Sequence, residues 1–222
     1  MTIVLKALPR HQLIMLFFLI ALCTVVELVL QLQEAGVIQT PRLRANLVDY
    51  AGFWPGLLYG WTPNYTAQPY VMFVSYAFIH AGLSHLISNM AVLYVLGRLV
   101  LQRVGGLGFG ALYTASAMGG AGLFALLARE VSPMVGASGA VFGLAGGLLA
   151  WNYVDRFWAK RRLWPVLWIA LGLVVLNIVH WWSTGGHLAW EAHLGGFLSG
   201  WVAALLIDPR SDPGGGEAAD PS

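Results

Sequence analysis

Long apolar runs, separated by short polar or glycine-rich stretches, dominate the pattern of hydrophobic and polar positions along the chain. Six of these runs reach or approach the roughly 20 apolar residues that a helix needs to cross a bilayer core. They cover residues 13–32, 83–104, 107–128, 135–153, 163–182 and 190–207. None shows the period-two alternation that is typical of barrel strands. The pattern therefore predicts an all-α polytopic membrane protein with a bundle of six transmembrane helices.

Two stretches fall outside these runs. Residues 33–82 form a long connection rich in Trp, Tyr, Phe and Pro, and such amphipathic rings favour the headgroup zone of a bilayer. The tail, residues 208–222, consists largely of Asp, Pro, Gly and Ser, a composition typical of disorder. We therefore divide the chain into an N-terminal segment (1–12), a membrane core (13–207) that includes an outer interfacial connection (33–82), and a disordered tail (208–222).

Composition supports a membrane protein and excludes other classes. Of the 222 residues, 58% are hydrophobic and 10% are charged, whereas soluble domains carry about 25% charged residues. A net charge of +2, and the lack of any stretch that combines a dense basic run with a polar context, argue against a nucleic-acid partner. The single cysteine, Cys23, excludes a disulfide framework and a cysteine-based metal cluster.

The positive charges predict the orientation of the helices. If the N-terminus is cytoplasmic, nine of the twelve Lys and Arg residues lie on the cytoplasmic side, and a cluster at 156–162 contributes most clearly. Both termini are then cytoplasmic, and the second, fourth and sixth helices begin at the outer leaflet. A compact core without further domains or a transit peptide suits a bacterial inner membrane.

Polar side chains at membrane depth are costly and indicate function. His85 and Asn89 are four residues apart, so they share one face at the start of the second helix. Ser138 opens the fourth helix and His193 opens the sixth. Because these three helices run in the same direction, the four side chains can meet in one layer near the outer leaflet.

Glycines indicate which helix faces can approach closely. Gly196 and Gly200 follow His193 on its own face, and the fourth helix carries a glycine at every fourth position, at 139, 143 and 147. Stripes of small residues let helix backbones come close together. A short hydrogen bond between Ser138 and His193 requires such an approach.

These residue types fit acyl transfer. Ser138 is the candidate nucleophile, and His193 can accept its proton and later protonate the leaving amine. The Ser138 backbone N–H and the side chains of His85 and Asn89 are candidate donors to the oxyanion. Glu191 lies off the face of His193, so the sequence predicts a Ser–His dyad.

Taken together, the motifs resemble those of the rhomboid family of intramembrane serine proteases. The resemblance rests on His80-x4-His85-x3-Asn89, on Gly136-Ala-Ser138-Gly139 and on Ala192-His193-x2-Gly196-x3-Gly200, and it covers roughly residues 10–207. It implies that Ser138 is the nucleophile, that His193 is the general base, and that His85, Asn89 and the Ser138 amide bind the oxyanion. It also implies supporting roles for His80 in a wet pocket, for Gly136 and for Phe142. The expected activity is cleavage of transmembrane segments of other membrane proteins, within a lipid environment and without a cofactor or metal.

The resemblance is incomplete at three places. Rhomboids commonly carry Trp-Arg shortly before the first motif histidine, where this chain has Val71-Met72. The acidic residue that the family places near the cytoplasmic end of the second helix is replaced around Leu101. The aromatic residue after the nucleophile, often Tyr, is Phe142, whose ring can still pack on His193. The first two changes leave open how the outer connection is anchored.

Simpler interpretations compete with each assignment. Ser138 alone could be a small packing residue, His193 an interfacial histidine, and His85 with Asn89 a helix-to-helix hydrogen bond. His80 is equally compatible with a structural role, and Glu27 is an intramembrane carboxylate without an evident partner.

Two other function classes are considered. One is a catalytically inactive relative that binds membrane clients, although both Ser138 and His193 are present. The other is a metal transporter or metalloprotease using His80, His85, His180, His187 and His193. No His-Glu-x-x-His helix supports it, and no acidic residue shares a face with His85.

Overall fold

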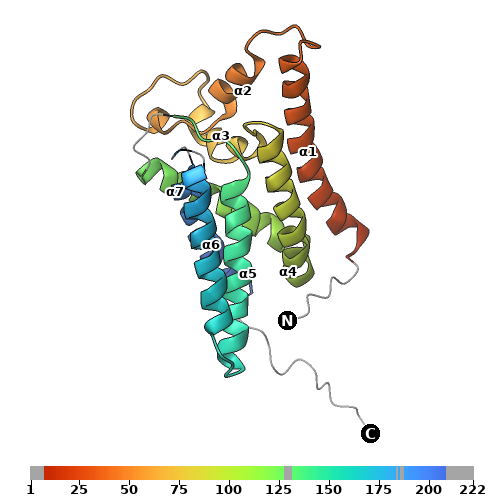
Figure 1. The fold of residues 1–222 in the computed structure, drawn as a ribbon, viewed down its shortest axis with the longest axis vertical. Coiled ribbons are helices and arrows are strands. Elements are labelled where there is room, and N and C mark those ends of the chain that lie inside the picture. The colour runs from red at the N-terminus through yellow and green to blue at the C-terminus, as the bar shows by residue number, and fades with distance from the viewer. Residues whose placement is uncertain (1–7, 128–131, 184, 186–187, 209–222) are drawn as a thin grey trace.

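A computed structural model of the chain describes residues 8–127, 132–183, 185 and 188–208. Within them the chain forms seven α-helices and two 3-10 helices and no strand beyond an isolated bridge. They are α1 (Arg10–Glu34), α2 (Leu43–Ala51), η1 (Pro55–Leu58), α3 (Gln68–Ser75), η2 (Tyr76–Phe78), α4 (Leu83–Leu127), α5 (Ser138–Trp158), α6 (Trp164–Ser183) and α7 (Trp190–Ile207). The predicted all-α class is confirmed. Figure 1 shows the short α2 and α3 gathered at one end of the long helices.

Four helices in the described part of the chain are long and apolar enough to cross a membrane: α1, α4, α6 and α7. The 45 residues of α4 cover the second predicted run and the third as far as Leu127, where the described residues are interrupted. The two arms meet at Gly105, whose φ of 68° and ψ of −171° interrupt the helix in a conformation that glycine adopts readily. The structure thus supports membrane-spanning helices, and the number six stays a prediction.

Helix α5 is not among these four and lies inside the bundle. Its packing is most extensive against α7 and α4, and most of its first fourteen residues are buried. Helix α1 buries only one face, formed by Leu16, Cys23, Glu27 and Leu30, while α6 buries only Val166. The arrangement therefore has α5 as its core and α6 as its most loosely packed helix.

Glycines bring α5 and α7 into backbone contact. A Cβ added to Gly196 would overlap the carbonyl oxygen of Gly139, and one added to Gly200 would overlap that of Gly143. No larger side chain fits without separating the two helices. The glycine spacing in the sequence thus correctly indicates a close approach of these faces.

The segment before α5 differs from the expected helix start at residue 135. Met134 and Phe53 exchange two backbone hydrogen bonds of 2.9 Å, and the N–H of Gly136 donates to the carbonyl of Tyr76 at 3.0 Å. Gly136 has a φ of 123°, which L side chains rarely adopt. These contacts tie Met134 and Gly136 to the outer connection, and the helix begins two residues later, at Ser138.

The connection 33–82 contains α2, η1, α3 and η2 and has its own apolar core. Phe53 is fully buried and makes an edge-to-face contact with Phe73 at a centroid distance of 5.1 Å. Met72, at a place where rhomboids commonly carry Trp-Arg, is fully buried, and Leu101 is buried in the main core. Apolar packing thus replaces both family features. Of the predicted disordered tail only Asp208 is described, and residues 1–7 and 209–222 lie outside the described ranges.

Candidate active site

Ser138 and His193 are joined by a hydrogen bond between α5 and α7. Ser138 is the first residue of α5, and its Oγ lies 2.9 Å from Nε2 of His193. His193 is on the first turn of α7 and is only 5% exposed. The glycine contacts described above set this separation, because they define how closely α7 lies against α5.

Two side chains hold the imidazole of His193 in place. The ring of Phe142 stacks on it with centroids 4.2 Å apart and an interplanar angle of 8°. On the other edge, Nδ1 of His193 lies 2.8 Å from Oδ1 of Asn177 in α6. Because a carbonyl oxygen only accepts, the proton sits on Nδ1, and Nε2 is then free to accept the hydroxyl proton of Ser138.

Asn177 is not among the residues that the sequence predicts for the site. The signal that could have found it is its position as the one amide in α6, a helix that is otherwise almost entirely apolar. An amide at membrane depth is costly without a partner, and its partner here is the candidate general base.

His85 lies beside the nucleophile segment. A Cβ on Gly136 would lie 2.9 Å from Nε2 of His85 and 2.7 Å from its Cε1, so only glycine leaves room for this ring. The N–H of Ala81 donates to Nδ1 of His85 at 3.4 Å. With Nδ1 accepting, the ring proton is on Nε2, the edge that faces Gly136.

Asn89 is buried one turn after His85 and is 6% exposed. Its Nδ2 donates one hydrogen bond to the carbonyl of His85 at 2.9 Å, and an amide nitrogen has a second N–H. At the first position of α5, helix geometry leaves the Ser138 N–H without an intrahelical acceptor. The structure thus places the His85 ring against Gly136, two residues before Ser138, and shows Asn89 bonded to its own helix.

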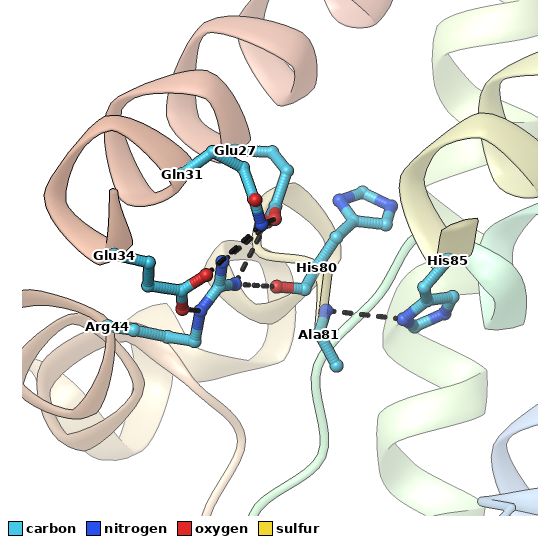
Figure 2. A network of polar contacts seen from close by, with 7 residues as sticks. All are labelled: Glu27, Gln31, Glu34, Arg44, His80, Ala81 and His85. Atoms are coloured by element: carbon cyan, nitrogen blue, oxygen red, sulfur yellow. Dashed lines mark hydrogen bonds and ion pairs between the residues drawn. The ribbon is translucent and has the colours of Figure 1, made fainter. Parts of the chain in front are cut away.

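His80 lies between the outer connection and His85. It is 1% exposed, and its ring contacts the ring of His85 edge-on at a centroid distance of 5.2 Å. Burial, and to a smaller extent the neighbouring His85, lowers the pKa of His80 to about 4. Its ring is therefore neutral near pH 7, and Figure 2 shows it between Glu27 and His85.

Glu27, for which the sequence indicated no partner, is fully buried and paired. Arg44 of α2 donates to it through Nη2 at 2.8 Å and through Nη1 at 3.0 Å, and Gln31 donates at 2.8 Å. In the predicted orientation Arg44 is one of three basic residues on the outer side, where the positive-inside rule does not expect them. This unexpected position is the signal that could have identified Arg44 as the partner of Glu27.

Two further histidines were weighed as metal ligands in the sequence, and the structure describes one of them, His180, which interacts electrostatically with His85 and His193. His180 is exposed near the end of α6, and His187 is outside the described residues. Among the residues that the structure describes, no group of three or more His, Cys, Asp or Glu side chains could hold a metal ion.

Comparisons with known proteins give one consistent result. The family model described as Rhomboid domain matches residues 67–210. RHOMBOID-like protein 1 of Arabidopsis thaliana is 36% identical over 140 residues, which are 60% of this chain and 33% of that protein. RHOMBOID-like protein 6, mitochondrial, of the same plant is 34% identical over 138 residues, 60% of this chain and 43% of the relative. Rhomboid-related protein 2 of Mus musculus is 34% identical over 107 residues, 48% of this chain and 34% of the relative.

The matched part of the chain spans between a third and a half of the length of these relatives. They come from a plant and a mouse, so they lend no support to the expected bacterial source.

Proposed function

The chain belongs to the rhomboid family and is an integral membrane protein, and from this premise we propose that it is an intramembrane serine endopeptidase. Ser138 is the nucleophile and His193 the general base. The observation that carries the proposal is the 2.9 Å hydrogen bond between Oγ of Ser138 and Nε2 of His193, which links residues 55 positions apart in the chain. The relatives bear rhomboid names that do not state an activity, so the catalytic role rests on this geometry.

In the first half of the reaction, Oγ of Ser138 attacks a substrate carbonyl carbon while Nε2 of His193 takes the hydroxyl proton. Collapse of the tetrahedral intermediate breaks the peptide C–N bond, and His193 returns the proton to the leaving amine. In the second half, His193 takes a proton from water, which attacks the acyl-enzyme ester. Collapse of this intermediate breaks the bond between the acyl carbon and Oγ, His193 returns the proton to Oγ of Ser138, and the new carboxyl group is released. Phe142 keeps the orientation of the imidazole ring, and Asn177 keeps the proton on Nδ1 while Nε2 gains and loses the second proton.

The oxyanion that forms in both halves needs fixed donors. The Ser138 backbone N–H, Nε2–H of His85 and the amide of Asn89 supply them in this proposal. The loss of one such donor typically lowers the rate by about 10²- to 10³-fold. Gly136 supports the arrangement by leaving space for the His85 ring.

The proposed substrate is a transmembrane segment of another membrane protein. Its helix must unwind locally, because a helical carbonyl is already hydrogen-bonded and is shielded from attack. Entry beside α6 is supported by the loose packing of that helix, in which only Val166 is buried.

The topology belongs to the same proposal. Both arms of α4 cross the membrane, which together with α1, α5, α6 and α7 makes six spans with cytoplasmic termini. The distribution of Lys and Arg favours this orientation, and it brings the starts of α4, α5 and α7 to the outer leaflet.

Labelling with a fluorophosphonate probe tests the proposal without knowledge of the client. The purified protein in detergent is incubated with the probe, and the adduct is located by mass spectrometry. We expect an adduct on Ser138 that is lost in His193→Ala and kept in Ser199→Ala, a matched control because Ser199 of α7 faces Gly119, away from the dyad. No adduct in a folded wild-type protein would overturn the proposal and favour the inactive, client-binding relative.

A further inference from the structure

The proposed catalytic steps do not use the ion pair between Glu27 and Arg44, although removing a charged group from water is costly. Glu27 is fully buried in α1, and its carboxylate accepts a hydrogen bond from each terminal nitrogen of Arg44. The pair connects α1 with α2, the first helix of the outer connection (Figure 2). The hydrogen bond to Glu27 raises the pKa of Arg44 above its ordinary value, so Arg44 remains charged.

Stability alone is a weak explanation for this pair. Desolvation of two charges commonly cancels their attraction, and apolar residues of similar volume often stabilise a buried site at least as well. An arginine guanidinium is planar and rigid, so it fixes the directions of several hydrogen bonds at once. A geometric role is the better explanation.

The Arg44 guanidinium also bonds to the backbone next to the candidate active site. Nη1 of Arg44, which contacts Glu27, also donates to the carbonyl of His80 at 2.6 Å. His80 then contacts His85 through its ring at a centroid distance of 5.2 Å. The next residue, Ala81, donates its N–H to Nδ1 of His85 at 3.4 Å. Two successive residues thus connect Arg44 with both the face and one nitrogen of the His85 ring, as Figure 2 shows.

We propose that Glu27 and Arg44 are positioning residues that hold residues 80–81 so that the Nε2–H of His85 points toward the oxyanion. The inference rests on the proposed function, which makes His85 an oxyanion donor. The hydrogen bond from Ala81 is long, and a bond of 3.4 Å orients a ring weakly by itself. The direction of the ring therefore depends on how firmly the backbone of residues 80–81 is held.

The first test is Arg44→Lys. A lysine keeps the positive charge beside Glu27, so the protein should fold, but an ammonium cannot reproduce the fork that joins the carboxylate to the His80 carbonyl. We expect the maximal rate of Ser138 labelling by fluorophosphonate to fall about tenfold, a fraction of the loss that follows removal of an oxyanion donor. The probe concentration at half-maximal rate should change little.

Two matched controls separate this effect from a general loss of packing. Arg103→Lys alters another forked pair, in which Arg103 donates to both carboxylate oxygens of Asp155 at 2.7 and 3.1 Å, without contact to residues 80–85. Glu34→Gln removes the negative charge of the half-exposed side chain that pairs with Nε of Arg44, and it leaves the contacts of Arg44 with Glu27 and His80 in place. Both variants should label at the wild-type rate.

The decisive comparison repeats Arg44→Lys in a His85→Ala background. If Arg44 acts through His85, the two losses are not additive and Arg44→Lys has no further effect on the residual rate. The same tenfold loss in both backgrounds would overturn the inference. If Arg44→Lys does not fold, the double replacement Glu27→Leu with Arg44→Leu, which removes both charges together, is measured in the same two backgrounds.

Failure of the proposed function gives a different result. A wild-type protein that is folded yet unlabelled contradicts the protease, and the positioning of His85 is then measured directly by ¹⁵N NMR of its ring. The inference expects a proton on Nε2 in the wild type and a mixture of tautomers in Arg44→Lys. Identical spectra in the two proteins would overturn it.

Discussion

Asn177 offers a sharp test of how the general base is oriented. Its Oδ1 accepts the Nδ1–H of His193 at 2.8 Å and belongs to α6, whereas the dyad belongs to α5 and α7. Asn177→Leu keeps the size and shape of the side chain and removes the acceptor. The ring of His193 then loses its preference for the tautomer in which Nε2 can receive the serine proton.

The size of the effect follows from the burial of the ring. His193 is 5% exposed, so water replaces the lost acceptor poorly. An unsatisfied buried donor costs about 1–3 kcal/mol. If this cost falls on the transition state, the rate decreases about 5- to 150-fold, since each 1.36 kcal/mol is a factor of ten. Because Asn177 itself is only partly buried, we expect a decrease near the lower end of this range.

The assay measures the maximal rate of fluorophosphonate labelling of Ser138 together with the thermal midpoint of the detergent-solubilised protein. Asn177→Asp keeps an acceptor and should restore the wild-type rate. Ile178→Ala, at the neighbouring position that is 60% exposed, should change neither quantity. An unchanged rate in a folded Asn177→Leu protein would refute the orienting role, and so would a decrease that Asn177→Asp does not reverse.

Three further predictions concern packing, stacking and pH. Gly196→Ala introduces a methyl group onto the carbonyl of Gly139 and should lower stability by about 1–3 kcal/mol or more, seen as a lower thermal midpoint; Gly172→Ala, where no atom lies within 4 Å, is the control and should be neutral. Phe142→Ala removes the ring stacked on His193 and should slow labelling about 2- to 10-fold, whereas Phe142→Tyr should not; equal rates in all three proteins would contradict the stack. The pKa of His80 is lowered from 6.5 to about 4, so between these pH values the unfolded chain binds more protons than the native protein. The stability that the neutral His80 ring contributes is therefore fully present above pH 6.5 and is lost as the pH falls toward 4. Thermal midpoints measured from pH 7 to 4 should therefore fall more steeply in the wild type than in His80→Gln. Glu27, Arg44 and His85 are the charged or titratable groups around the ring in both proteins, so their own titration affects both curves. Parallel curves would contradict this prediction.

Sequence reasoning was most successful where one residue type has few alternatives. Long apolar runs predict helices because a membrane-spanning backbone must satisfy its own hydrogen bonds, and the helix class and the start of α7 at Trp190 agree with that expectation. The glycines at 139, 143, 196 and 200 indicated a backbone contact because only glycine permits one, and the structure contains it. Residue types alone also singled out Ser138 and His193, which lie within hydrogen-bond distance.

Sequence reasoning failed where a contact depends on the path of the chain between elements. The fourth apolar run begins at residue 135, ahead of α5, because nothing local shows that Met134 pairs with Phe53, 81 residues away. Arg44 was assigned to the outer connection without a function because its partner, Glu27, is in another helix and is reached only through the turn at residues 35–42. Asn177 was overlooked for the same reason, since a single amide in an apolar helix gives no indication of the residue that it contacts.

The groups proposed for catalysis are positioned by two kinds of contact. This difference predicts which variants lower the stability of the fold and which lower the reaction rate. Ser138 and His193 are set by glycine contacts between two core helices, so changes at those glycines should unfold the protein before they impair chemistry. The ring of His85 is instead proposed to depend on Arg44 of α2 through the backbone of residues 80–81, and the far edge of His193 contacts Asn177 of α6; both elements lie at the periphery. These contacts contribute little apolar burial, so neutral or conservative changes there should spare the fold and slow the reaction. A protein in which Arg44→Lys and Asn177→Leu both lower the thermal midpoint as much as Gly196→Ala does would contradict this division, because it would mean that the peripheral contacts also determine the packing of the core.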